Sequence, residues 1–70
     1  MKIEIYGTKT CNMCKMLCKK LDEKEISYKY EQNFEVVQLI AKKYNASSVP
    51  IIVVNDVLYN MKTFSEQFLV

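Results

Sequence analysis

The chain has 70 residues, of which 50% are apolar and 26% charged, and its formal net charge at pH 7 is +2. A chain this short buries only about 60% of the surface that it exposes when unfolded, so it supports one core, and we expect a single domain over residues 1–70. It contains no His, Arg or Trp. These absences exclude imidazole bases and bidentate Arg contacts to phosphate or guanine, so no nucleic-acid partner is expected.

The sequence carries no signal for a membrane or for secretion. No apolar stretch approaches the roughly 20 residues that cross a bilayer, and residues 1–6 lack the apolar core of a signal peptide. Three Cys residues are an odd number and too few for a secreted disulfide scaffold. We therefore expect a monomeric, cytoplasmic protein with no membrane partner.

The first half of the chain predicts a strand, a helix and a second strand. Residues 2–6 alternate between polar and apolar side chains, which is typical of a strand, and Gly7 and Thr8 follow as a turn. From Cys11 to about Lys24 the apolar positions recur at helical spacing, and residues 26–31 form a short second strand rich in Tyr. The apolar stripe of the predicted helix consists of Cys14, Leu17, Cys18 and Leu21.

The second half predicts a helix, two strands and a final helix. Asn33 caps a helical pattern that runs to Asn45, and residues 45–48 form a turn. Residues 49–54 are almost continuously apolar, as in a strand with both faces covered, and residues 57–59 follow a turn at 55–56. In the last segment, residues 60–70, Thr63 and Glu66 match a capping box. The element order is β-α-β-α-β-β-α, an α/β fold.

Two cysteines spaced as CxxC carry the clearest chemistry of the chain. Cys11 and Cys14 follow a strand and a turn and open a helix. The free backbone N–H groups and the positive end of the helix dipole stabilise a thiolate there, and Lys9 adds a nearby positive charge, so we expect a pKa for Cys11 below about 8.5. Cys14 lies one turn further along, on the buried stripe. This arrangement predicts that Cys11 attacks a disulfide and that Cys14 resolves the mixed disulfide.

The run Tyr6-Gly7-Thr8-Lys9-Thr10-Cys11-Asn12-Met13-Cys14, followed by Ser48-Val49-Pro50, resembles the glutaredoxins over essentially the whole chain. The resemblance implies a thioredoxin-like fold with a central four-stranded mixed sheet flanked by helices. It also implies that the bond before Pro50 is cis, that Pro50 packs beside the CxxC, and that Val49 offers its backbone to a peptide or to glutathione. Glutathione is then the expected reductant, and no tightly bound cofactor is implied.

Two departures from the family pattern bear on substrate and reductant. Many glutaredoxins have a Gly-Gly pair where this chain has Asn60-Met61, and that pair binds the γ-glutamyl end of glutathione. The short form of the chain resembles the redoxins that donate electrons to ribonucleotide reductase. The expected partners are therefore a disulfide-containing protein, ribonucleotide reductase among them, and as reductant either glutathione or a flavoprotein of the thioredoxin reductase type.

Each further site residue has a structural alternative. Tyr6 and Lys9 are binding candidates, but Tyr6 also suits the end of a buried strand and Lys9 a solvated turn. Pro50 also suits the first residue of a strand. Thr63 caps the last helix, whose free N–H groups also suit a carboxylate of glutathione. Cys18 fits the core better than a redox role.

A metal-binding module is the alternative function. Small Cu(I) chaperones have a similar length and a CxxC at a loop-to-helix junction, where thiolates suit Cu(I). The predicted helix at residues 33–45 stands where those proteins have a strand, and a tetrahedral zinc site lacks a fourth Cys or His. Some glutaredoxins also bridge a [2Fe-2S] cluster with glutathione. No protein metal ligands are predicted for the leading function.

Overall fold

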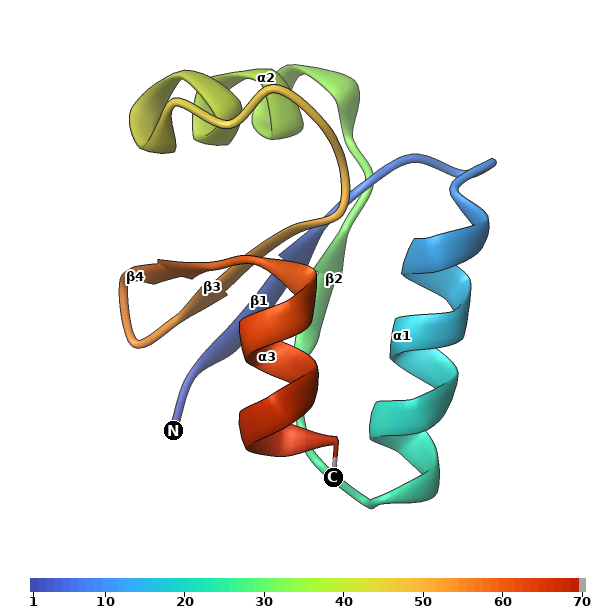
Figure 1. Ribbon diagram of the computed structural model, residues 1–70. Helices are drawn as coiled ribbons and strands as arrows, with labels where there is room; N and C mark the ends of the chain where they lie inside the picture. The colour runs from blue at the N-terminus through green and yellow to red at the C-terminus, as the bar shows by residue number, and fades with distance from the viewer. Residues whose placement is uncertain (70) are drawn as a thin grey trace.

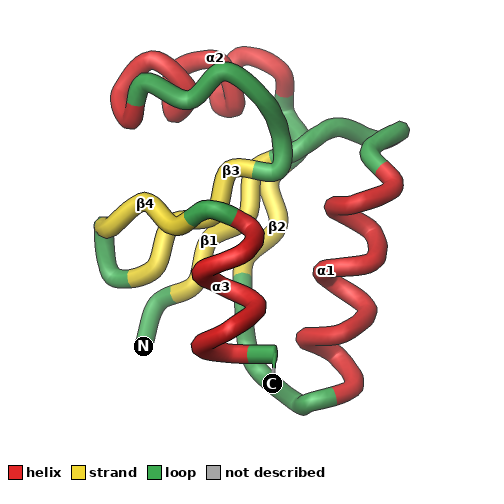
Figure 2. The backbone as a smooth tube through the Cα atoms, in the orientation of Figure 1, coloured by secondary structure: helices red, strands yellow, loops and turns green. Residues whose placement is uncertain are grey.

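The computed structural model describes residues 1–69, and its seven elements follow the predicted order. Figure 1 shows their course and Figure 2 marks the same elements by type. The elements are β1 (Ile3–Tyr6), α1 (Asn12–Glu23), β2 (Lys29–Glu31), α2 (Phe34–Tyr44), β3 (Ile51–Val54), β4 (Val57–Tyr59) and α3 (Met61–Phe68).

The four strands form one mixed sheet in the order β2-β1-β3-β4. β1 runs parallel to β2 and antiparallel to β3, and β4 is antiparallel to β3. Tyr6 pairs with Glu31 on one side and with Ile51 on the other, and Tyr59 pairs with Ile52. The ends of β1, β2 and β4 and the beginning of β3 therefore lie at the same end of the sheet.

Helices cover both faces of the sheet, as the α/β prediction requires. α1 and α3 pack on one face and α2 on the other (Figure 1). Successive side chains of a strand point to opposite faces, so β1 and β3 each contribute to both cores. The core under α1 and α3 consists of Ile3, Ile5, Leu17, Leu21, Ile52, Val54 and Phe64; the core under α2 consists of Tyr6, Val37, Ile51 and Val53.

The predicted β3 is confirmed as a strand buried on both faces, since all four of its residues are buried. It begins at Ile51 rather than at residue 49, because Pro50 has no N–H to give to a sheet. β2 is shorter than predicted: residues 26–28 connect α1 to it, and only residues 29–31 pair with β1. The helix predicted after Asn33 is confirmed, with the Asn33 Oδ1 accepting from the amides of Glu35 and Val36.

The cap of the last helix differs from the prediction. α3 begins at Met61 and its N-cap is Asn60, whose Oδ1 accepts from the Thr63 amide at 2.7 Å. Thr63 therefore lies inside the first turn, and the predicted cap at Thr63 is wrong. Asn is as good an N-cap as Thr, and it stands three residues before the amide that it binds. None of the helices within residues 1–69 has the length and apolar character needed to cross a membrane.

Candidate functional site

The register of the sheet brings three connecting segments to one end of the molecule. The loop after β1 leads into α1, residues 45–50 lead into β3, and Asn60 joins β4 to α3. A groove of about 500 Å³ lies between these segments. Its lining includes Met13 from α1, Val49 and Pro50 before β3, and Met61 from α3. The beginning of α1, which carries the CxxC, and the Val-Pro pair thus share one surface.

Cys11 and Cys14 lie at the beginning of α1, as predicted. Cys11 is the N-cap residue, half-buried, and Cys14 is fully buried one turn later. Their Cα atoms are 5.3 Å apart, within the range that a disulfide spans, and the two sulfur atoms are bonded. The Cys14 amide also donates a hydrogen bond to the Cys11 Sγ at 3.1 Å. Cys11 is thus partly accessible to solvent and its sulfur accepts from a helix N–H, while Cys14 is enclosed.

Gly7 makes room for the enclosed sulfur. It is buried, and a Cβ added to it would collide with the Cys14 Sγ and lie 3.3 Å from the Cys14 Cβ. The Gly7 amide donates to the Glu31 carbonyl at 3.0 Å, which continues the pairing of β1 with β2 for one more residue. The loop to Cys11 therefore begins directly beside Cys14, and this close approach requires a residue without a side chain.

Tyr30 holds the loop that carries Cys11. Its hydroxyl donates to the Thr8 carbonyl at 2.9 Å, and the same carbonyl accepts from the Cys11 amide at 3.3 Å. Tyr30 is half-buried, and burial is the main cause that raises the pKa of its hydroxyl. The hydroxyl therefore stays protonated at neutral pH and can donate. Through the shared carbonyl, β2 fixes the position of the Cys11 backbone.

The groove is neutral and largely apolar. The Val49–Pro50 peptide bond is cis, as the resemblance implied. Within residues 1–69, the side chains that line the groove carry no charge. Two of them are large apolar side chains with substantial exposure, Met13 at 51% and Leu58 at 42%. Among the described residues the groove therefore lacks a positive charge that would bind a carboxylate, and its exposed apolar side chains suit contact with an apolar segment.

Thr63 does not line the groove. Its amide is already bonded to the Asn60 side chain at 2.7 Å. One of the N–H groups of the last helix that were predicted to be open to a carboxylate of glutathione is thus occupied by a residue of the chain itself.

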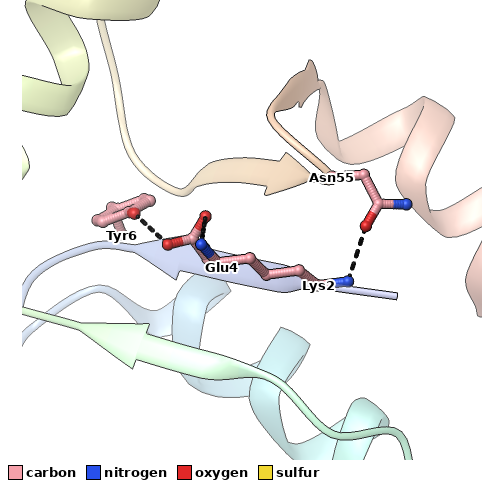
Figure 3. Close-up of polar contacts among 4 residues, drawn as sticks. All are labelled: Lys2, Glu4, Tyr6 and Asn55. Carbon is pink, nitrogen blue, oxygen red and sulfur yellow. Dashed lines mark hydrogen bonds and ion pairs between the residues drawn. The ribbon is translucent and has the colours of Figure 1, made fainter.

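Tyr6 and Lys9 lie apart from the groove lining. Tyr6 is buried in the core under α2, and its hydroxyl donates to the Glu4 Oε2 at 2.9 Å (Figure 3). Burial, followed by this hydrogen bond, raises the pKa of Tyr6 to about 12. Glu4 also lies 4.0 Å from the Lys2 Nζ. Lys9 is exposed in the turn before Cys11. Tyr6 thus takes the structural role that the sequence left open.

Cys18 lies one helical turn after Cys14 and carries a free thiol. It is half-buried and packs against the core under α1 and α3. Burial raises the pKa of its thiol, with the hydrogen bond to Tyr28 acting in the opposite direction. These properties agree with the predicted packing role. Across residues 1–69 no group of three or more His, Cys, Asp or Glu side chains is placed to hold a metal ion.

Three residues that support the site were not predicted: Gly7, Tyr30 and Asn60. The sequence pattern predicts Gly7 only as a turn residue. As the one Gly of the chain, directly after a strand, it is also typical of a position where another part of the chain packs closely against the backbone. Asn60 is a good N-cap residue and that signal was present in the sequence. Tyr30 could not be found in this way, because its bond to Thr8 spans 22 positions and depends on the parallel pairing of β1 with β2.

Comparison with known proteins agrees with this geometry. The family model described as Glutaredoxin matches residues 3–59, which covers the CxxC, the Val-Pro pair and all four strands. Neither the search of curated proteins nor that of solved structures gave a match. Glutaredoxins in general are thiol oxidoreductases that act on disulfides with glutathione. The family match spans well over half of the sequence, and the chain therefore belongs to the glutaredoxin family.

Proposed function

We propose that the protein is a dithiol electron carrier that reduces protein or glutathione mixed disulfides, with Cys11 as the nucleophile and Cys14 as the resolving thiol. We also propose that residues 1–70 act as one glutaredoxin-like domain and as a monomer. The observation that carries this proposal is the difference between the two sulfur environments. Cys11 is half-exposed at a helix N-cap, and Cys14 is fully buried beside it.

In the first step the Cys11 thiolate attacks one sulfur of a substrate disulfide. A bond forms between Cys11 and that sulfur, the substrate S–S bond breaks, and the second substrate sulfur leaves as a thiolate. The hydrogen bond from the Cys14 amide and the positive end of α1 support the negative charge on Cys11 before the attack. The expected pKa of Cys11 in the reduced protein lies below the usual value of about 8.5.

In the second step Cys14 gives up its proton and attacks the Cys11 Sγ. The Cys11–Cys14 bond forms, the bond between Cys11 and the substrate sulfur breaks, and this sulfur leaves as a thiolate, which takes up the proton that Cys14 gave up. The Cα separation of 5.3 Å is compatible with this bond without movement of the backbone. Two electrons thus pass from the dithiol to the substrate, and the oxidised protein then needs two electrons from a reductant.

For the reductant we propose glutathione or a flavoprotein of the thioredoxin reductase type, and no tightly bound cofactor. The family supports glutathione. The neutral groove and the Thr63 amide bonded to Asn60 favour the flavoprotein, because both reduce what the site offers to the carboxylates of glutathione. A ribonucleotide reductase is the proposed protein substrate, on the resemblance of this short chain to the redoxins that serve that enzyme.

The test is a disulfide-reduction assay with two separate electron sources. One contains glutathione and glutathione reductase, and the other contains NADPH and thioredoxin reductase. We expect turnover with at least one source and none for the Cys11→Ser variant. The Lys24→Gln variant, changed at the far end of α1, serves as a matched surface control. The proposal is wrong if neither source supports turnover, or if Cys11→Ser is as active as the unchanged protein.

A further inference from the structure

We propose that the partner of this site is a protein segment in which the disulfide has apolar neighbours and acidic flanks. In this proposal the groove takes the apolar neighbours, and Lys15 and Lys19 on α1 attract the acidic flanks. The inference rests on the proposed function and deepens it, because it assigns a substrate class to the same cysteine pair.

The first observation is the distribution of charge along α1. The residues from Gly7 to Leu21 include four Lys and neither Asp nor Glu. Lys15 and Lys19 follow Cys11 at spacings of four and eight, so they lie on the same stripe of the helix, one and two turns away. Both are exposed, and the Lys15 amide donates to the Cys11 carbonyl at 3.2 Å. An approaching partner therefore meets positive charge next to the exposed sulfur.

Of the acidic side chains, Asp22, Glu23 and Asp56 lie far from Cys11, and Glu31 lies nearer to it. Asp22 and Glu23 are in the last turn of α1, where they follow Lys19 by three and four residues and offset part of its charge, but they lie about 16–18 Å from Cys11 at 1.5 Å per residue. This distance is at least twice the Debye length of about 8 Å at physiological salt. Glu31 is at the same end of the sheet, and its carbonyl accepts from the Gly7 amide at 3.0 Å, so its carboxylate opposes part of the lysine charge. Its Oε2 accepts from the Asn33 amide at 3.1 Å. Asp56 lies in the turn beyond the other end of β3.

The second observation is the apolar surface beside the charge. Met13 and Leu58 line the groove with exposed fractions of 51% and 42%, and Met16 is 58% exposed one turn after Met13. Methionine side chains adapt to irregular apolar surfaces, and a groove of about 500 Å³ is within the usual range for a ligand. The apolar lining suits the apolar residues of a peptide segment, while Lys15 and Lys19 lie on a different side of α1 from Met13, so a segment that crosses Cys11 would reach both surfaces.

The experiment compares disulfide probes in single turnovers of the reduced full chain, quenched with acid and separated by chromatography. Three peptides share one internal disulfide and the same apolar residues, and differ only in flanks of Asp, Gln or Lys. Oxidised glutathione is the fourth probe. At low ionic strength we expect the Asp-flanked peptide to react about tenfold faster than the Lys-flanked one, with the Gln-flanked peptide between them. At about 0.5 M salt, with a Debye length near 4 Å, the difference should fall to about twofold or less.

Variants locate the charge that is responsible. Lys15→Gln should lower the ratio of the Asp-flanked rate to the Gln-flanked rate by about twofold at low salt, and Lys19→Gln by less, because Lys19 is further from Cys11 and next to Asp22 and Glu23. Lys24→Gln removes an exposed Lys beyond the acidic turn of α1, about 20 Å from Cys11, and should change that ratio less than Lys15→Gln does.

Each remaining outcome decides the inference. Equal rates for the Asp-flanked and Lys-flanked peptides would overturn it and leave the proposed function intact. It would also be overturned if oxidised glutathione reacted as fast as the Asp-flanked peptide. If none of the four probes were reduced, the proposed function would fail, and the inference would fail with it.

Discussion

Replacement of Gly7 by Ala tests the packing that encloses Cys14. The new Cβ would collide with the Cys14 Sγ and lie 3.0 Å from the Tyr30 Oη. Neither neighbour can move freely, since Cys14 is fully buried and the Tyr30 hydroxyl is bonded to the Thr8 carbonyl. Overpacking of this kind costs about 1–3 kcal/mol. A 70-residue domain is stable by roughly 4–10 kcal/mol, so the loss should be easy to measure.

The assay is a double-mutant cycle of urea unfolding, with all proteins reduced so that the disulfide does not contribute. Gly7→Ala alone should lower the free energy of unfolding by about 1–3 kcal/mol. In a Cys14→Ala background the same change should cost about 1–2 kcal/mol less, because the collision with the Cys14 Sγ is removed while the contacts with the Tyr30 Oη at 3.0 Å and the Cys14 Cβ at 3.3 Å remain. The coupling between the two sites should therefore be about 1–2 kcal/mol.

Two results would refute this reasoning. One is a loss below about 0.5 kcal/mol for Gly7→Ala alone, which is the size of an ordinary surface substitution. The other is an equal loss in both backgrounds, which would show that the Cys14 sulfur is not what Gly7 makes room for. The Gly7→Ala variant also bears on function, because a displaced Cys14 sulfur should slow the resolving step.

Three further predictions follow from the tyrosines and the free thiol. Tyr30→Phe removes one of the two hydrogen-bond donors to the Thr8 carbonyl. It should lower the free energy of unfolding by about 1 kcal/mol and make hydrogen exchange of the Cys11 amide several-fold faster. An unchanged exchange rate would contradict the role of Tyr30 in holding the loop. The pKa of Tyr6 is about 12 in the folded protein and 10.0 as the ordinary value. Its contribution to the free energy of unfolding is therefore complete below pH 10 and is lost as the pH rises to 12. The loss should be about 1 kcal/mol once solvent screening is allowed for. Urea unfolding across this range should show a shallower decline for Tyr6→Phe, and equal declines would contradict the assignment. In the oxidised protein, burial raises the pKa of Cys18, so alkylation by iodoacetamide at pH 8 should be several-fold slower than for free cysteine, and equal rates would contradict its packing role.

The order of elements followed from the sequence because each element has a strong local signal. The helical stripe from Cys14 to Leu21 and the apolar run of β3 identified elements that later proved to pack on the sheet. The ends of elements were less predictable. Residues 26–28 have the composition of a strand but lie outside the ladder, because only residues 29–31 reach β1. Which residues of a strand pair with a neighbour depends on the tertiary fold, so the local sequence of a short segment does not predict it.

The residues of the candidate site also differ in how far the sequence alone predicts them. Cys11, Cys14, Val49 and Pro50 form recognisable motifs, so they were found without coordinates. Tyr30 supports Cys11 from a neighbouring strand, and no local pattern connects the two. Asn60 competes with Thr63 as the cap of α3, and the choice depends on where β4 ends. Sequence patterns thus identify the candidate site residues, while the residues that position them depend on tertiary contacts.

The central claim is that Cys11 attacks and Cys14 resolves, and trapping the mixed disulfide tests it most directly. Reduced Cys14→Ser and Cys11→Ser variants, both in a Cys18→Ala background, are mixed with an excess of a disulfide peptide, and the adducts are followed by mass spectrometry. We predict that Cys14→Ser rapidly accumulates a stable adduct on Cys11, whereas Cys11→Ser forms an adduct on the buried Cys14 at least about tenfold more slowly. Equal or faster labelling of Cys14 would contradict the assigned roles.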